Sequence, residues 1–253
     1  DITQLAAKLA RFYQQLPPET IRSVEYRQEI EHHVRDNYRE LQDPVHGLPV
    51  EVVKRVHRKQ LRFLTLWRDL FDNRVCDGRI IEGHGDLRPE HIYLVPAPVI
   101  IDCIEFNREF RTLDVADELG FLAMECDRLG AGHVGNRVIQ HYCRISDDHP
   151  PDVLLYFYKG YRACVRSKVH ALRAQQLAAI PRSTDLEMAA AYLRLADQYE
   201  AQLGPPLLLV VRGLTGTGKS TLAQALAEVL HMELLQTDVI RRELFGPSPG
   251  PAD

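Results

Sequence analysis

Two carboxylates and a histidine near the middle of the chain form a pattern suited to phosphoryl transfer. Asp86 lies in the glycine-containing stretch Gly83–His91, and Asp102 ends a short apolar run that follows it. Phosphoryl transfer needs the charge on the phosphates to be neutralised and the acceptor hydroxyl to be held in line. We therefore expect Asp86 to accept the hydroxyl proton, and Asp102, with His91 or Glu105, to hold magnesium.

An apolar hairpin joins these two carboxylates. The runs Ile92–Leu94 and Val99–Ile101 predict two short strands, with prolines at the turn between them. Protein-kinase-like phosphotransferases use this order of catalytic-loop Asp, downstream metal ligand and strand-end Asp. The alternative is an Asp that caps a turn and a buried Asp at a strand end. Because magnesium prefers oxygen ligands, the imidazole of His91 could instead bind phosphate or orient Asp86.

The residues His84–Leu94 resemble the aminoglycoside phosphotransferase family, whose loop runs His-Gly-Asp-Leu-His-Pro-x-Asn. The stretches Ile101–Asn107 and Phe157–Ala163 fit the same family. The resemblance implies that residues 1–203 form the helical C-lobe of a kinase-like fold. This chain departs from the family at His91, where the family carries Asn. Arg88, in the same loop, is a candidate substrate contact, as is Glu105.

Helical patterns cover most of the first 203 residues and would support this loop. Prolines at 150, 151 and 181 are expected to break them, and residues 17–49 are ambiguous between helix and loop. We expect Asp114 and Asp117 to lie in the first turn of a helix, where its dipole favours negative charge, with direct catalysis as the alternative. The expected helices are Ile2–Leu16, a long helix from Val52 to Phe71, Val134–Cys143, Val153–Leu177 and Leu186–Leu203.

The segment Phe157–Arg173 predicts a helix with a basic edge beside an apolar one. At 100° per residue its cationic side chains fall within an arc of about 80°. We expect this edge to face solvent; the alternatives are contact with an anionic substrate or ion pairs with Asp114–Glu118. The cationic residues are Lys159, Arg162, Arg166, His170 and Arg173.

A second nucleotide motif follows two prolines near residue 205. The apolar run Leu207–Val211 predicts a buried parallel strand, and an amphipathic helix is expected at Ser220–Leu230. Between them the chain matches Gly-x-x-x-x-Gly-Lys-Ser/Thr. The order of strand, loop and helix is the context in which this motif indicates a phosphate-binding loop. Lys219 would reach the β- and γ-phosphates of ATP, and Ser220 would be a ligand of Mg²⁺. The expected nucleotide-binding residues are Gly213, Thr215, Gly216, Thr217, Gly218, Lys219, Ser220 and Thr221.

The residues after the motif predict a second short strand, Met232–Gln236, and then the segment Thr237–Leu244. This segment is similar to small-molecule P-loop kinases and zeta-toxin-like kinases. By that resemblance Asp238 is a catalytic base or substrate ligand and Arg241 a phosphate or substrate contact. The alternative is a helix N-terminus with an exposed arginine.

Together the two resemblances look like bacterial two-part proteins in which an aminoglycoside phosphotransferase-like domain is fused to an ATP-binding kinase domain. The expected fold is mainly α with α/β: a kinase-like C-lobe at 1–203, then the first β-loop-α-β-α part of a P-loop kinase domain at 204–253. Residues 17–50 lack the Gly-rich strand pair and strand lysine that hold ATP in a kinase-like fold. We therefore expect the N-lobe to be absent and the chain to be a fragment.

Composition narrows the functional class. A net charge of -4 over 253 residues gives no electrostatic case for nucleic acid, and no apolar run has the roughly 20 residues of a membrane span. Five scattered cysteines fit a reducing cytoplasm. The sequence carries no signal for an oligomeric state. We expect a phosphotransferase that moves phosphate from ATP to a small-molecule hydroxyl; the alternative is a non-enzymatic ATP-binding regulator whose degenerate kinase lobe controls the P-loop unit.

Overall fold

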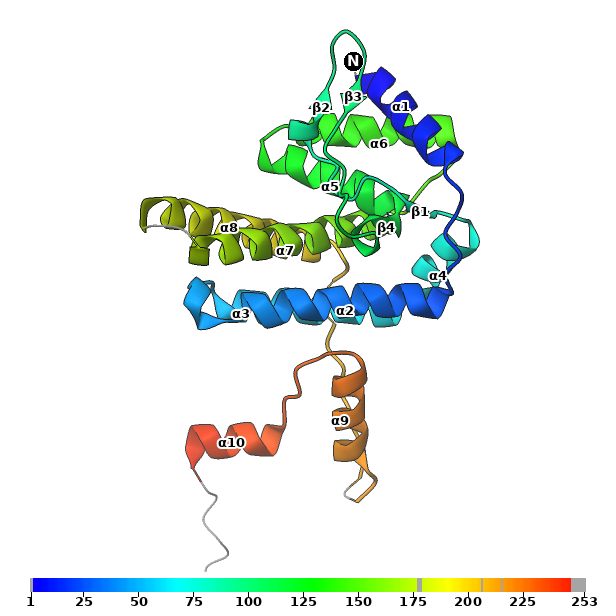
Figure 1. The fold of residues 1–253 in the computed structure, drawn as a ribbon. Coiled ribbons are helices and arrows are strands. Elements are labelled where there is room, and N and C mark those ends of the chain that lie inside the picture. Colours follow the sequence, from blue (N-terminus) through cyan, green and yellow to red (C-terminus); the bar gives the residue numbers. More distant parts are fainter. Residues whose placement is uncertain (1, 177–178, 206, 215, 247–253) are drawn as a thin grey trace, which may run out of the picture. The chain divides into compact units, whose positions relative to one another are not determined.

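The computed structural model describes residues 2–176, 179–205, 207–214 and 216–246, without the side chains of 179–181, 238 and 245. The chain separates into two compact units, residues 1–205 and 206–253 (Figure 1). Each unit is described below by itself.

The first unit is built mainly of α-helices. The long helix expected to run from Val52 to Phe71 is two helices, because Trp67 leaves helical geometry with φ -113° and ψ 28°. The expected break at Pro181 is wrong: this proline lies in the first turn of α8, where its missing N–H costs no helical hydrogen bond. The ambiguous residues 17–49 contain a helix, α2. The helices are α1 Ile2–Gln15, α2 Ser23–Leu41, α3 Val50–Leu66, α4 Arg68–Cys76, α5 Val115–Arg128, α6 Gly132–Ser146, α7 Asp152–Gln176 and α8 Ala179–Glu200.

Two short antiparallel strand pairs lie among these helices. The predicted hairpin is β2 Ile92–Tyr93 and β3 Val99–Ile100, with Ile92 opposite Ile100. The other pair, which the sequence did not indicate, joins β1 Ile80–Glu82 to β4 Thr112–Asp114. Because β1 precedes the Gly83–His91 loop and β4 precedes α5, this pairing brings the loop to the start of α5.

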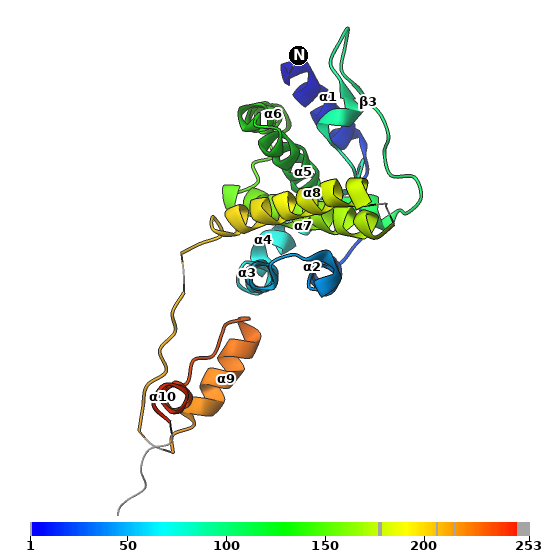
Figure 2. The same ribbon diagram turned by 90° about the vertical axis from the view of Figure 1, so that its left-hand side faces the viewer.

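Helix α5 lies at the centre of the first unit. Every residue from Val115 to Cys126 is buried, so this helix has no solvent face over that length. Figures 1 and 2 show α7 and α8 side by side, with α2 and α3 on one side of them and α1, α5 and α6 on the other. At the contact between α5 and α6, a Cβ on Gly135 would lie 2.7 Å from the Ala123 Cα. Only glycine allows the two helices to come so close.

The core contains ion pairs as well as apolar side chains. Arg74 is buried and contacts both Asp114 and Asp148, with 2.6 Å between its Nη2 and the Asp114 Oδ1. Asp114 also caps α5 by accepting the Ala116 N–H at 2.8 Å, so the first-turn interpretation of this residue is confirmed. Buried ions on this scale are costly unless paired, and here each has a partner.

The basic edge predicted on α7 faces solvent at Arg173 but not at its first two residues. Lys159 and Arg162 are buried, and each forms an ion pair with a carboxylate of α5. Arg162 pairs with Asp117, one of the alternatives that the sequence left open. The expectation of a solvated edge is therefore wrong for these two residues, because α5 places acidic side chains opposite them.

The second unit contains the helices α9 Lys219–Val229 and α10 Thr237–Phe245. The predicted helix after the glycine-rich motif is confirmed. The predicted strands Leu207–Val211 and Met232–Gln236 are wrong, because neither segment is in a strand. Within the described residues of this unit no strand offers them a hydrogen-bonded partner, and Leu208 is 79% exposed instead of buried.

None of the described helices combines the length and the apolar character needed to cross a lipid bilayer.

Candidate functional site

The loop Gly83–His91 turns sharply between β1 and β2. Gly85 has φ +81°, a conformation that side chains disfavour, and a Cβ there would lie 2.8 Å from the carbonyl oxygen of Phe110. The loop ends in a 3₁₀ turn, Pro89–His91, that leads directly into β2. The backbone course of the loop therefore depends on glycine at position 85.

The buried carboxylate of Glu118 on α5 holds this loop by hydrogen bonds to its backbone. Glu118 Oε1 accepts the backbone N–H groups of His84 at 2.5 Å and Gly85 at 2.6 Å. A Cβ on Gly83 would come within 2.9 Å of the same oxygen. Burial raises the pKa of Glu118, while the two backbone N–H groups act in the opposite direction. Sequence reasoning missed Glu118; the available signal was a second acidic residue beside Asp117 at the start of an otherwise apolar helix.

A second contact reaches the loop from α7. The Arg162 guanidinium forms two hydrogen bonds to Asp117, at 2.7 and 2.6 Å, and its Nη1 lies 3.4 Å from the Gly85 carbonyl oxygen. Burial raises the pKa of Asp117, and the positive charge of Arg162 opposes that shift. Two neighbouring acidic residues of α5 thus reach Gly85, one directly and one through Arg162.

His84 joins the loop to the segment that carries Asp102. Its Nδ1 accepts the Asp86 N–H at 3.2 Å, so its Nε2 carries the proton and donates to the Ile101 carbonyl at 2.8 Å. Since Ile101 directly precedes Asp102, one imidazole links the backbone at both candidate carboxylates.

His91 lies between the two carboxylates. Its Nδ1 is 2.9 Å from the Asp86 carbonyl oxygen and 3.7 Å from the Asp86 Oδ2, and its Nε2 is 3.2 Å from the Asp102 Oδ2. The structure therefore brings Asp86, His91 and Asp102 together. Asp102 has φ +64° and a side chain that is 73% exposed, so it lies at the surface of this group.

Arg88 supplies positive charge at the same place. Its Nε forms an ion pair with Asp86 Oδ1 at 3.0 Å, and its Nη2 lies 3.0 Å from His91 Nε2. Arg88 donates to His91 Nε2 when that nitrogen is unprotonated, whereas a protonated Nε2 would donate to Asp102. The candidate substrate contact Arg88 is thus already paired with the candidate catalytic carboxylate.

These residues do not fit a magnesium site. Magnesium prefers octahedral oxygen coordination, whereas the pair available here is one imidazole and one carboxylate. The other candidate ligand, Glu105, is exposed. Within the described ranges no group of three or more His, Cys, Asp or Glu side chains is placed to hold a metal ion.

The glycine-rich motif of the second unit forms a turn that leads into α9. Gly216 and Gly218 have φ of +81° and +80°, conformations that suit glycine. Thr217 Oγ1 donates to the Leu214 carbonyl at 2.8 Å, and Lys219 Nζ donates to the same oxygen. The lysine therefore folds back over the loop instead of extending into solvent.

The other predicted residues of this unit are placed as follows. Ser220 and Thr221 are exposed in the first turn of α9, and Arg241 is exposed on α10. Thr215 and the side chain of Asp238 lie outside the described residues. A Cβ on Gly213 would lie 3.1 Å from Thr217 Oγ1, so the start of the motif is close to its middle.

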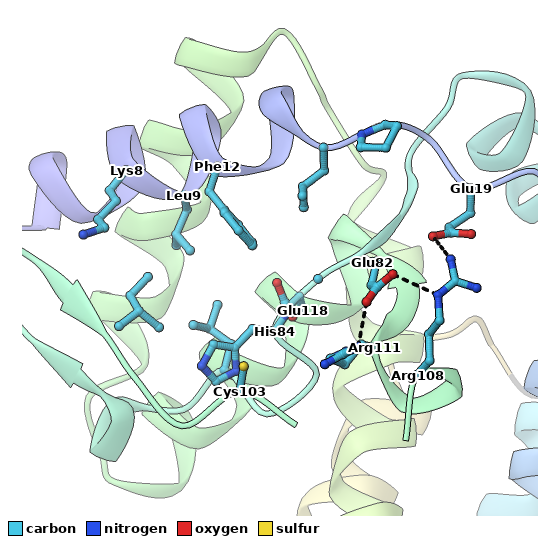
Figure 3. A pocket seen from close by; sticks show the side chains of 15 residues that line it. Lys8, Leu9, Phe12, Glu19, Glu82, His84, Cys103, Arg108, Arg111 and Glu118 are labelled. Carbon is cyan, nitrogen blue, oxygen red and sulfur yellow. Dashed lines mark hydrogen bonds and ion pairs between the residues drawn. The ribbon is translucent and has the colours of Figure 1, made fainter. Parts of the chain in front are cut away.

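Two cavities border the Gly83–His91 loop. The larger, of about 560 Å³, lies between α1 and the loop and has His84 and Leu87 in its lining. Figure 3 shows Leu9 and Phe12 of α1 on one side of it, and an ion-pair cluster at its edge. In that cluster Arg108 bonds Glu19 and Glu82, and Arg111 bonds Glu82. The other cavity, of about 360 Å³, is lined by Gly85 and Asp86.

Comparison with known proteins gives one family match and three relatives. Residues 208–253 match the family model described as an AAA domain, which indicates a P-loop NTPase-like domain in that segment. Uncharacterized proteins of Mycobacterium bovis and of two strains of Mycobacterium tuberculosis are 36% identical to this chain over 195 residues. The match covers 77% of the chain, which spans only 38% of the length of these relatives. No solved structure matches the chain.

Proposed function

We propose that this chain belongs to an ATP-dependent phosphotransferase that transfers phosphate to a hydroxyl group of a small molecule. The glycine-rich turn at the start of α9 carries the proposal. It matches the phosphate-binding motif at each defining position, and Lys219 folds over it. Backbone N–H groups at such a turn and at a helix N-terminus attract phosphate oxygens.

Magnesium fits this second unit through Ser220. Its hydroxyl stands in the first turn of α9, directly after the lysine, as this motif requires. A magnesium ion held there with ATP would neutralise charge on the β- and γ-phosphates. Asp238 and Arg241, at the start of α10, are the residues that we assign to the acceptor in this unit.

We assign the first unit, residues 1–203, to a kinase-like lobe of the aminoglycoside phosphotransferase type, and residues 204–253 to the P-loop kinase domain. Asp86 is the proposed base in the first unit, since its carboxylate lines a cavity and its loop is held by Glu118 of α5 and Arg162 of α7. His91 lies beside Asp86, and Asp102 lies at the other ring nitrogen of His91.

One observation favours the non-enzymatic alternative for the first unit. The Asp86 carboxylate already pairs with Arg88, and the neighbouring donors are a poor set for magnesium. In that alternative the lobe regulates the P-loop unit without transferring phosphate itself. Arg88 then stabilises the loop in place of a metal ion.

Binding of a fluorescent ATP analogue tests the P-loop assignment. We expect Lys219→Ala to weaken binding by about tenfold or more, because a charge-assisted hydrogen bond to phosphate is lost. Lys54→Ala is the matched control, since Lys54 lies in the first unit on the surface of α3. Equal affinity of the Lys219→Ala variant and the unchanged protein would contradict the assignment.

Transfer of labelled γ-phosphate from ATP to a metabolite pool separates the two alternatives for the first unit. Loss of all products in Asp86→Asn would assign catalysis to the Gly83–His91 loop. Products that depend on Lys219 alone would assign it to the P-loop unit and leave the first unit a regulator.

A further inference from the structure

The cavity beside Asp86 has the size of a small-molecule site. It encloses about 360 Å³ and is lined by α2, the Gly83–His91 loop, the segment Ile104–Leu113, α5 and α7. Binding sites for small ligands usually measure about 300 to 1,000 Å³. If Asp86 acts as proposed, this cavity holds the phosphoryl acceptor, so the inference below rests on the proposed function.

Most charges of the cavity cancel within the protein. Arg162 pairs with Asp117 at 2.6 Å and His33 with Glu109 at 3.1 Å. Asp86 itself is paired with Arg88. Asp117 and Asp86 are therefore neutralised, and Glu109 is neutralised when His33 is protonated, so the lining lacks the several unpaired carboxylates that would attract a polycation.

Three charged side chains of the lining remain. Arg166 lies 3.4 Å from the Glu125 carboxylate of α5, and the other two, Lys168 and Glu29, have opposite charges. Burial lowers the pKa of Lys168 and raises the pKa of Glu29, so each is driven toward its neutral form. Whether both are charged or both neutral, they add no net charge. An uncharged ligand suits the cavity better than an ionic one.

Aromatic rings form one wall of the cavity and its mouth. Phe106 and Phe110 contact edge to face with centroids 6.2 Å apart, and His33 lies 6.2 Å from Phe110. Phe106 is 82% exposed and Phe110 44% exposed, while Tyr161 is buried deeper in the lining. Exposed aromatic rings that border a cavity provide a surface on which a flat ring can stack.

A buried amide in the lining has no partner among the described residues. Asn37 of α2 is 2% exposed, and neither its Nδ2 nor its Oδ1 makes a hydrogen bond. An unpaired buried polar group destabilises the folded state, so its presence indicates that another molecule completes its hydrogen bonds. An amide offers one donor and one acceptor side by side, the pattern that matches the edge of a nucleobase such as adenine.

We propose that this cavity binds a neutral nucleoside, whose base stacks on Phe106 and Phe110 and pairs with Asn37 while its sugar hydroxyls lie toward Asp86. In the transfer step a hydroxyl oxygen forms a bond to the γ-phosphorus of ATP. The bond from that phosphorus to the β–γ bridging oxygen breaks, ADP leaves, and Asp86 takes the hydroxyl proton.

Titration calorimetry of the 253-residue protein with adenosine tests the site. We expect Asn37→Leu to weaken adenosine binding about tenfold, through the loss of two hydrogen bonds. Phe110→Ala should weaken it about fivefold or more, through the loss of a stacking surface. Matched controls are Asn136→Leu, an exposed asparagine of α6, and Phe12→Ala, a 40% exposed ring that lines the other cavity.

Two more titrations test where the ligand binds and which charge it carries. Lys219→Ala should leave adenosine binding unchanged, which shows that the ligand is not held at the P-loop. Kanamycin, a polycationic aminosugar, should bind more weakly than adenosine. Kanamycin binding that is tighter than adenosine binding would overturn the proposal. It would also be overturned if the Asn37 variant bound adenosine as well as the Asn136 variant and the Phe110 variant as well as the Phe12 variant.

The nucleoside site and the proposed phosphotransferase activity can be tested separately. Adenosine binding that depends on Asn37 and Phe110, without transfer of labelled phosphate, would retain the nucleoside site and reject the phosphotransferase. Transfer of phosphate by a protein whose adenosine affinity is unchanged by both substitutions would retain the phosphotransferase and reject the nucleoside site. Circular dichroism of each variant shows that the fold is kept, and Phe110→Ala changes a surface ring even if Asn37→Leu unfolds the protein.

Discussion

Helices α5 and α9 each lie against a glycine-containing loop with a proposed role in phosphate chemistry, yet they are built in opposite ways. Every residue of α5 from Val115 to Cys126 is buried, whereas no described side chain of α9 is buried. The Gly83–His91 loop, which packs on α5, is held by Glu118 and Arg162. These residues are 33 and 77 residues away from Gly85 in the chain. The loop before α9 is closed by contacts within five residues.

This difference shows how much of each site the rest of the fold must supply. The proposed phosphate-binding turn uses Gly216 and Gly218, which have positive φ, and Lys219, which folds back over the loop. The Gly83–His91 loop takes its shape from distant buried charges. A sequence motif therefore defines the second site almost completely and the first only in part.

The largest expected effect comes from removing a charge that supports the first loop. Arg162→Met would leave Asp117 buried and unpaired, and we expect a loss of about 3 to 5 kcal/mol in the free energy of unfolding of the first unit. Urea unfolding followed by Trp67 fluorescence measures it, because Trp67 is the one tryptophan of the sequence and lies between α3 and α4.

The matched control for that change is Arg39→Met. Arg39 is 73% exposed and pairs with Asp36 on the surface of α2, so we expect a loss below about 0.5 kcal/mol. A similar loss in both variants would mean that the loop does not depend on its distant partners, and the contrast with the second site would disappear.

Local patterns allowed much of this fold to be predicted. The apolar spacing of α1 and the prolines around the β2–β3 turn indicated the helix and the hairpin, and the motif before α9 indicated the start of that helix. Each of these signals lies within about one element. Asp86 and Asp102 were paired on the basis of one hairpin, which is also local.

Interactions between distant segments could not be predicted in the same way. Glu118 has no motif of its own, and its role depends on the pairing of β1 with β4, which brings the loop to α5. Leu207–Val211 illustrates the reverse error. An apolar run predicts a buried strand only when a neighbouring strand is present to pair with it, and the described residues of the second unit provide none.

A pH-dependent effect should distinguish a buried carboxyl group of the first unit from an exposed one. Burial raises the pKa of Glu200, at the end of α8, to about 8. The folded protein therefore binds one more proton than the unfolded chain between the ordinary glutamate pKa and pH 8. Stability should fall by about 1.4 kcal/mol per pH unit across that window as pH rises.

Glu200→Gln removes this titration. The variant should resemble the unchanged protein near pH 5 and be the more stable of the two, by about 2 kcal/mol or more, at pH 8. Glu51→Gln on the surface of α3, where the side chain is 80% exposed, should show no such divergence. Parallel pH profiles for the Glu200 variant and the unchanged protein would show that this carboxyl is charged in the fold.

The smallest expected effect concerns the metal preferences of the two sites. The second unit offers magnesium a hydroxyl oxygen at Ser220, whereas the first offers the imidazole of His91 beside Asp102. An amide oxygen is a harder ligand than an imidazole nitrogen. We therefore expect His91→Asn to raise magnesium affinity by about fivefold, which corresponds to about 1 kcal/mol. Magnesium titration in a Ser220→Ala background isolates the first site, and Asp102→Ala should abolish the gain because it removes the only formal negative charge of the pair. Weaker binding in His91→Asn would show that the imidazole is itself a ligand of choice, and the first site would then select a transition metal over magnesium.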